Sequence, residues 1–148
     1  MTVVFLDTNI PMYVAGEDHP LKIPCFRILT LVADHPSSFA TDAEVLQEIL
    51  HRYMALNRRG RAPQAVLEFA FLMEGRVEPV TAPDVVRAAE VAGSYPRLSA
   101  RDLLHLEVMH RLQISRIISA DSAFDGITDV ERLDPSLVDV WAGTLGLS

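Results

Sequence analysis

The stretch Thr2-Val3-Val4-Phe5-Leu6-Asp7-Thr8-Asn9 decides the fold class of this 148-residue chain. A run of β-branched and aromatic apolar residues is typical of a strand that is buried on both faces, as in a parallel sheet. The run ends at Asp7, and a helical pattern begins at Ile10-Pro11. In open α/β sheets the functional crevice lies beyond the carboxyl ends of the strands. We therefore expect Asp7 at the mouth of a crevice; the alternative is that Asp7, Thr8 or Asn9 merely caps the next helix.

The rest of the chain alternates helical and strand patterns. The spacing of apolar residues predicts helices over residues 10–15, 21–33, 43–58, 63–73, 83–92 and 99–112. Short apolar runs predict strands over residues 38–40, 76–80, 116–119 and 130–133, and the tail beyond Pro135 is predicted as a weak helix or an extended segment. Strands that alternate with helices predict an α/β fold with a mostly parallel sheet. No repeat or linker divides the chain, so residues 1–148 are expected to form a single domain.

The helix predicted from residue 43 begins with a cap pattern. Thr41-Asp42-Ala43-Glu44 matches a capping box, in which the threonine accepts a backbone hydrogen bond and the glutamate reaches back. We therefore assign Glu44 to the cap, which leaves Glu48 as the acid available for a functional site. The buried side of this helix is predicted to carry Val45, Leu46, Ile49, Leu50, Tyr53 and Met54.

Composition narrows the class of protein. Hydrophobic residues make up 49% of the chain and charged residues 22%, which is typical of a soluble globular protein. No apolar run approaches the roughly 18 residues that cross a bilayer, and no signal peptide opens the sequence, so we expect a cytoplasmic protein. Cys25, the only cysteine, excludes an internal disulfide and is predicted to be buried. The net charge of −7 argues against broad adhesion to nucleic acid. One cluster of basic residues could hold phosphates, or it could simply form a solvated helix end: Arg52, Arg58, Arg59 and Arg61.

Four carboxylates stand just past a predicted strand or near the start of a helix: Asp7, Glu48, Asp102 and Asp121. Parallel strands project their carboxyl ends to one edge of the sheet, so these side chains are expected to converge although they lie far apart in sequence. Carboxylates at close range repel one another unless a cation is present, and oxygen ligands suit Mg²⁺ or Mn²⁺. The pattern predicts a metal site.

Each acid also has a purely structural explanation. Glu48 could pair with Arg52 one turn away, Asp102 could reach back to Ser99 in a helix cap, and Asp121 could close the turn after its strand. His105, three residues after Asp102, is interpreted as a packed or hydrogen-bonded histidine rather than a catalytic one. The alternative function is therefore a non-catalytic binding or dimerisation module in which the acids act as helix caps.

Four motifs resemble, in order and spacing, those of the PIN-domain family, in particular the VapC-type toxins of toxin-antitoxin pairs. They are Leu6-Asp7-Thr8-Asn9, the segment 44–53, Arg101-Asp102-Leu103-Leu104-His105-Leu106, and Ser119-Ala120-Asp121-Ser122-Ala123-Phe124-Asp125. The resemblance implies a three-layer α/β/α fold and a metal-dependent endoribonuclease that cleaves RNA. It also implies a cognate VapB-type antitoxin, which would dock on the hairpin of two apolar helices and on the active-site groove.

The resemblance assigns a role to each acid. Asp7 and Asp102 resemble the principal ligands of Mg²⁺, with Mn²⁺ as the other candidate ion; Glu48 resembles the acid that binds metal or orients water, and Asp121 the fourth acid. The remaining positions would support these acids by hydrogen bonding or by added charge: Thr8, Asn9, Ser119 and, less centrally, Asp125. Independently, the apolar content of residues 49–73 predicts a homodimer, although part of it would belong to the antitoxin surface.

Overall fold

A five-stranded parallel sheet forms the centre of the computed structural model, which describes residues 2–147. The strands lie in the order β3-β2-β1-β4-β5: β1 (Val4–Leu6) is central, β2 (Phe39–Asp42) and β4 (Arg116–Ile118) flank it, and β3 (Val77–Glu78) and β5 (Glu131–Leu133) form the edges. All three residues of β1 are buried, as the opening apolar run predicts. The chain leaves β1 toward β2 and β3 and returns through β4 on the other side, so the topological switch point lies beside Asp7.

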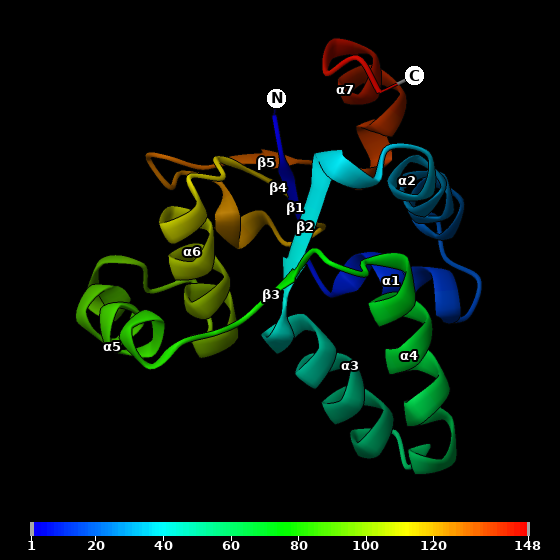
Figure 1. The fold of residues 1–148 in the computed structure, drawn as a ribbon, viewed down its shortest axis with the longest axis horizontal. Coiled ribbons are helices and arrows are strands. Elements are labelled where there is room, and N and C mark those ends of the chain that lie inside the picture. The colour runs from blue at the N-terminus through cyan, green and yellow to red at the C-terminus, as the bar shows by residue number, and fades with distance from the viewer. Residues whose placement is uncertain (1, 148) are drawn as a thin grey trace.

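Helices cover both faces of the sheet, which confirms the predicted three-layer α/β/α fold (Figure 1). On one side lie α5 and α6, and on the other α1, α2 and α7, while α3 and α4 form a hairpin beyond the sheet (Figure 1). Their bounds are α1 (Asn9–Ala15), α2 (Lys22–Asp34), α3 (Ala43–Ala55), α4 (Ala62–Leu72), α5 (Ala82–Val91), α6 (Ala100–Leu112) and α7 (Val138–Thr144).

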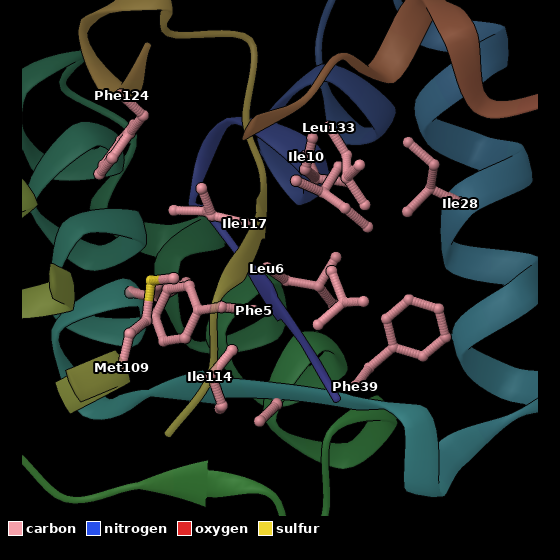
Figure 2. Close-up of a cluster of buried hydrophobic side chains, with 14 of the residues drawn as sticks. Phe5, Leu6, Ile10, Ile28, Phe39, Met109, Ile114, Ile117, Phe124 and Leu133 are labelled. Carbon is pink, nitrogen blue, oxygen red and sulfur yellow. The ribbon is translucent and has the colours of Figure 1, made fainter. Parts of the chain in front are cut away.

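The core lies on both sides of β1 because successive side chains of a strand point to opposite faces. Phe5 faces Met109 of α6, whereas Leu6 faces the side of the sheet that holds Ile28 of α2 (Figure 2). Cys25 is fully buried in the same core, as predicted. Within residues 2–147, no helix combines the length and the apolar character needed to cross a membrane.

Three predictions for α3 are wrong. The N-cap is Asp42 rather than Thr41: β2 continues to Asp42, whose Oδ1 accepts a hydrogen bond from the Val45 amide at 3.0 Å, while the Thr41 hydroxyl donates to the Leu6 carbonyl at 2.9 Å. The tertiary contact with β1 thus replaces the local capping box that would have used Glu44. The helix also ends at Ala55, and two residues predicted on its buried side are exposed: Leu50 and Met54.

Candidate metal centre

Asp7, Asp102 and His105 converge at the carboxyl edge of the sheet. Asp7 directly follows β1, whereas Asp102 and His105 lie in the first two turns of α6. One ligand atom from each lies within 4.8 Å of the other two, and both Asp7 and His105 are buried. Within the described residues this is the one group of three or more such side chains close enough to share an ion.

The Asp7 carboxylate is held from both sides of the switch point. Its Oδ1 accepts from the Thr8 amide at 2.7 Å, and its Oδ2 accepts from the Ser119 hydroxyl at 2.6 Å and from the Asn9 side chain at 3.2 Å. Asn9 also accepts from the Ala120 amide at 3.2 Å, which ties the ends of β1 and β4 together. Thr8 precedes α1 without a side-chain cap hydrogen bond, so these polar residues position Asp7 rather than cap the helix.

Asp102 serves as a helix cap and faces the acid cluster at the same time. Its Oδ2 accepts from the Ser99 amide at 3.3 Å, and its own amide donates to the Ser99 hydroxyl at 3.2 Å, which completes a capping box at the start of α6. The structural explanation considered for Asp102 is therefore present, but it does not replace the convergence with Asp7. Burial raises the pKa of Asp102, and the nearby charge of Asp121 raises it further.

Glu48 reaches the cluster through Thr8. Its Oε2 accepts from the Thr8 hydroxyl at 2.7 Å, and the Thr8 amide binds Asp7, so a single residue connects the two acids. Glu44 also lies at this edge: burial raises the pKa of its carboxyl, and the charges of Asp42 and Glu48 raise it as well. The residue that the capping-box prediction set aside is thus part of the acidic surroundings.

The last two acids border the cluster at the end of β4. The Asp121 amide donates to the Ser119 hydroxyl at 3.0 Å, and its carboxylate caps the turn that follows by accepting from the Ala123 amide at 2.9 Å. Asp125 instead binds Arg132 through two hydrogen bonds of 2.9 and 3.2 Å. Arg132 also donates to the Ser119 carbonyl at 3.0 Å, so this arginine connects the Asp125 carboxylate to the end of β4.

Sequence reasoning missed the partnership of His105 with Asp42. His105 Nδ1 lies 2.7 Å from Asp42 Oδ2, and both side chains are buried. His105 Nε2 lies 3.8 Å from Asp7 Oδ1, which is too long for a hydrogen bond. Among residues 2–147 this nitrogen is the one buried side-chain polar atom without a hydrogen-bond partner. The sequence does mark Asp42 as a candidate site residue, because it stands at the end of β2 as Asp7 stands at the end of β1.

The electrostatics of the cluster favour a cation. Burial raises the pKa of Asp7, because the ionised form loses its hydration, and the charge of Asp102 adds to the shift. Burial alone would lower the pKa of His105, but the hydrogen bond and charge of Asp42, with the charges of Asp7 and Asp102, raise it to about 9. With this pKa, Nε2 carries a proton at neutral pH, so a divalent ion binds this nitrogen only by displacing that proton to solvent. The two carboxylates and the deprotonated nitrogen are then donors that a divalent ion accepts. The residues present therefore fit a metal ion.

The similarity of this chain to known proteins extends over most of its length. A PIN domain family model matches residues 4–130, a segment that contains all the acids described above. The chain is 40% identical over 131 residues to VapC ribonuclease Mb1869c of Mycobacterium bovis and to Ribonuclease VapC13 of Mycobacterium tuberculosis, covering 88% of this chain and 99% of each relative. Ribonuclease VapC23 of Mycobacterium tuberculosis is 37% identical over 119 residues, covering 80% of this chain and 93% of the relative.

Two solved structures share the fold. VapBC2 of Rickettsia felis, bound to a DNA fragment from its promoter, superposes with a TM-score of 0.66 at 17% identity, covering 90% of this chain and 100% of that chain. VapC20 of Mycobacterium tuberculosis, a toxin that cleaves the sarcin-ricin loop, superposes with a TM-score of 0.62 at 25% identity, covering 86% of this chain and 98% of that chain.

Proposed function

The chain belongs to the PIN-domain family, and from this premise we propose that it is a metal-dependent endoribonuclease of the VapC type. The observation that carries the proposal is the convergence of Asp7, Asp102 and His105 on one buried edge. A binding module with acids as helix caps has no need for this convergence. The relatives named as VapC ribonucleases support the same reaction class.

We assign the metal to Asp7 and Asp102, with Mg²⁺ or Mn²⁺ as the ion. When bound, such an ion neutralises the phosphodiester, acidifies a water and steadies the leaving oxygen. Ser119 and Asn9 hold the Asp7 carboxylate in one orientation through Oδ2. The Ser99 cap does the same for Asp102, so both carboxylates are oriented before any ion or substrate arrives.

The other acids act around this pair. Glu48 is fixed by the Thr8 hydroxyl, and we assign it the role of orienting the attacking water. Asp121 is exposed, and its charge acts on Asp102, so we propose it as the fourth acid of the site. Asp125 is engaged by Arg132, and its proposed role is to support the end of β4.

We further propose that a cognate VapB-type antitoxin docks in a groove beside the helical hairpin. The groove encloses about 750 Å³ between α1, α2, α3 and α4. Its lining is mostly apolar and includes Met12, Leu29, Tyr53, Phe69 and Leu72. An amphipathic helix buries its apolar face in a groove of this kind. The exposed Leu50 and Met54 line a separate, smaller hollow and are proposed as part of a homodimer contact.

The test is a cleavage assay on structured single-stranded RNA with purified protein, in Mg²⁺, in Mn²⁺ and in chelator. Asp7→Asn and Asp102→Asn are expected to lower the cleavage rate at least about 100-fold, because each removes a charge that holds the ion. Asp34→Asn, at an exposed end of α2, is the matched control and is expected to cleave normally. Each variant is melted in parallel to establish that it folds.

Undiminished cleavage by both site variants, or full activity in chelator, would overturn the proposal. A thermal melt with and without each ion distinguishes the nuclease from the alternative, a non-catalytic binding module. An ion that binds only the folded protein stabilises it by about 2.7 kcal/mol at 100 times its dissociation constant. A melting temperature that does not respond to either ion, together with no cleavage, would favour the module.

A further inference from the structure

We propose that His105 supplies a third protein ligand to the metal through Nε2, and that this nitrogen makes the site prefer Mn²⁺ to Mg²⁺. The inference rests on the proposed function, because it needs an ion held by Asp7 and Asp102. It goes further by assigning a nitrogen ligand and a selectivity to a site whose other candidate ligands are carboxylates.

The position of Nε2 fits shared coordination. This nitrogen is buried without a hydrogen-bond partner and lies 3.8 Å from Asp7 Oδ1. Two atoms bound to one ion lie no more than about 4.2 Å apart, because each bond is about 2.1 Å long. The separation from Asp7 already satisfies this limit, and the three ligand atoms together span at most 4.8 Å. Small side-chain shifts therefore suffice to bring all three ligand atoms within bonding distance of one ion.

Asp42 prepares the ring for this role. Its Oδ1 accepts from the Val45 amide at 3.0 Å, and its Oδ2 lies 2.7 Å from His105 Nδ1. An ionised carboxylate only accepts hydrogen bonds, so Nδ1 donates to Asp42 and Nε2 is directed at the other acids. An ion that binds Nε2 displaces the proton that this nitrogen carries at neutral pH, and the proton passes to solvent. A carboxylate behind a histidine is the arrangement that orients metal-bound imidazoles and increases their basicity. Phe5 packs against the ring with centroids 5.3 Å apart and limits its rotation.

The selectivity follows from the donor atom. Mg²⁺ is a hard ion that binds oxygen ligands and keeps several of its waters. Imidazole nitrogen suits first-row transition ions, and Mn²⁺, although the weakest binder of that series and itself well suited to carboxylates, accepts a nitrogen ligand more readily than Mg²⁺ does. His105 is fully buried, so no solvent water occupies the position of its Nε2. A Mg²⁺ ion at the site would therefore face the imidazole nitrogen there and not a water molecule. Mn²⁺ therefore gains an interaction that Mg²⁺ does not.

The test is pulsed electron paramagnetic resonance of the Mn²⁺-loaded full-length chain, with Mn²⁺ and Mg²⁺ dissociation constants measured by titration calorimetry. We expect nuclear modulation from a directly bound imidazole nitrogen, which changes to the ¹⁵N pattern when the histidines are ¹⁵N-labelled. His105→Asn is expected to remove this signal and weaken Mn²⁺ binding by about 10- to 100-fold, with a smaller effect on Mg²⁺. Asp42→Asn, which keeps the ring but changes its partner, should weaken Mn²⁺ binding in the same direction.

His110→Asn provides the matched control, since His110 lies on the same helix with a side chain that is 37% exposed. It should leave the nitrogen signal and both dissociation constants unchanged. Bound Mn²⁺ without nitrogen modulation in the parent protein would overturn the inference, even if His105→Asn fails to fold. Equal losses of Mn²⁺ and Mg²⁺ affinity in a folded His105→Asn would also overturn it. RNA cleavage without nitrogen modulation would leave the proposed function standing, whereas absence of both ion binding and cleavage would remove both.

Discussion

Replacing Asp84 with asparagine should loosen the helix that carries Asp102 and His105. Asp84 is fully buried on α5 and receives four hydrogen bonds: Arg87 at 2.6 Å, Arg111 of α6 at 3.1 and 3.0 Å, and the Thr81 amide at 2.9 Å. These bonds divide equally between Oδ1 and Oδ2. Asparagine keeps one of these two oxygens as an acceptor and has an NH₂ group in place of the other. The two groups that donated to the replaced oxygen lose their acceptor, so two of the four hydrogen bonds are lost.

The size of the effect follows from these contacts. A hydrogen bond to a charged group contributes about 1.5 to 3 kcal/mol. The lower figure applies here because the Arg87 and Arg111 side chains are 43% and 30% exposed, and water replaces part of the lost interaction. The two lost bonds therefore amount to about 3 kcal/mol in the free energy of unfolding, which for a chain of this length lowers the melting temperature by roughly 6 to 12 °C.

Urea denaturation followed by circular dichroism measures this change directly. Asp139→Asn is the control, because Asp139 is 66% exposed and pairs only with Arg27, itself 55% exposed, in the part of the chain that the structure describes. An exposed pair of this kind contributes less than about 1 kcal/mol. A loss below about 1 kcal/mol for Asp84→Asn, or an equal loss for Asp139→Asn, would refute the reasoning.

The same carboxylate predicts a pH dependence. Burial opposes ionisation of Asp84, but hydrogen bonds from Arg111 and Thr81 outweigh it and lower the pKa from 3.8 to about 2. A pKa that is lower in the folded state means that the stabilisation is complete above pH 3.8 and is lost as the pH falls toward 2. The stability difference between the parent and Asp84→Asn should therefore shrink over that interval, and a difference that stays constant would contradict the assignment.

Three further outcomes are expected. Cys25, whose pKa burial raises to about 12, should resist thiol reagents at pH 8 until denaturant is added, and rapid labelling of the folded protein would contradict its burial. Thr8→Val should lower RNA cleavage by about 10-fold without unfolding the chain, because Glu48 loses its hydroxyl donor; an unchanged rate would remove that role. Phe71→Asp, at a residue that lines the antitoxin groove and is 78% exposed, should weaken capture of the cognate antitoxin in a pull-down while cleavage continues, and undiminished capture would place the antitoxin elsewhere.

Much of the fold could be predicted because the relevant patterns are local. Val4, Phe5 and Leu6 form an unbroken apolar run, and a strand with that pattern is buried wherever it lies. The order of strands and helices follows from similar runs, and it brings the acids to one edge of the sheet. Asp7 and Asp102 converge as expected for this reason alone.

The parts that were wrong or missed depend on contacts between distant segments. The capping box at Thr41 is a valid local pattern, but Leu6 offers that hydroxyl a carbonyl from the neighbouring strand. The position of Asp42 at the end of a strand marks it as a candidate site acid, but its pairing with His105 joins residues 63 positions apart, and no spacing within either segment identifies that partner. Leu50 and Met54 match the helical period of a buried face, yet that period does not reveal where the neighbouring elements end.

The hydrogen bond between Asp7 and Ser119 joins residues that are 112 positions apart, and this distance has a consequence for the timing of synthesis. A ribosome makes Asp7 112 residues before Ser119, so Asp7 is synthesised well before β4 and the serine that follows it, which hold it in place. Contacts of such long range form late, since the intervening chain must first be brought together. A fragment released early by an interrupted message would therefore carry Asp7 without its partners, and a cell could translate such a message partway without acquiring a working nuclease.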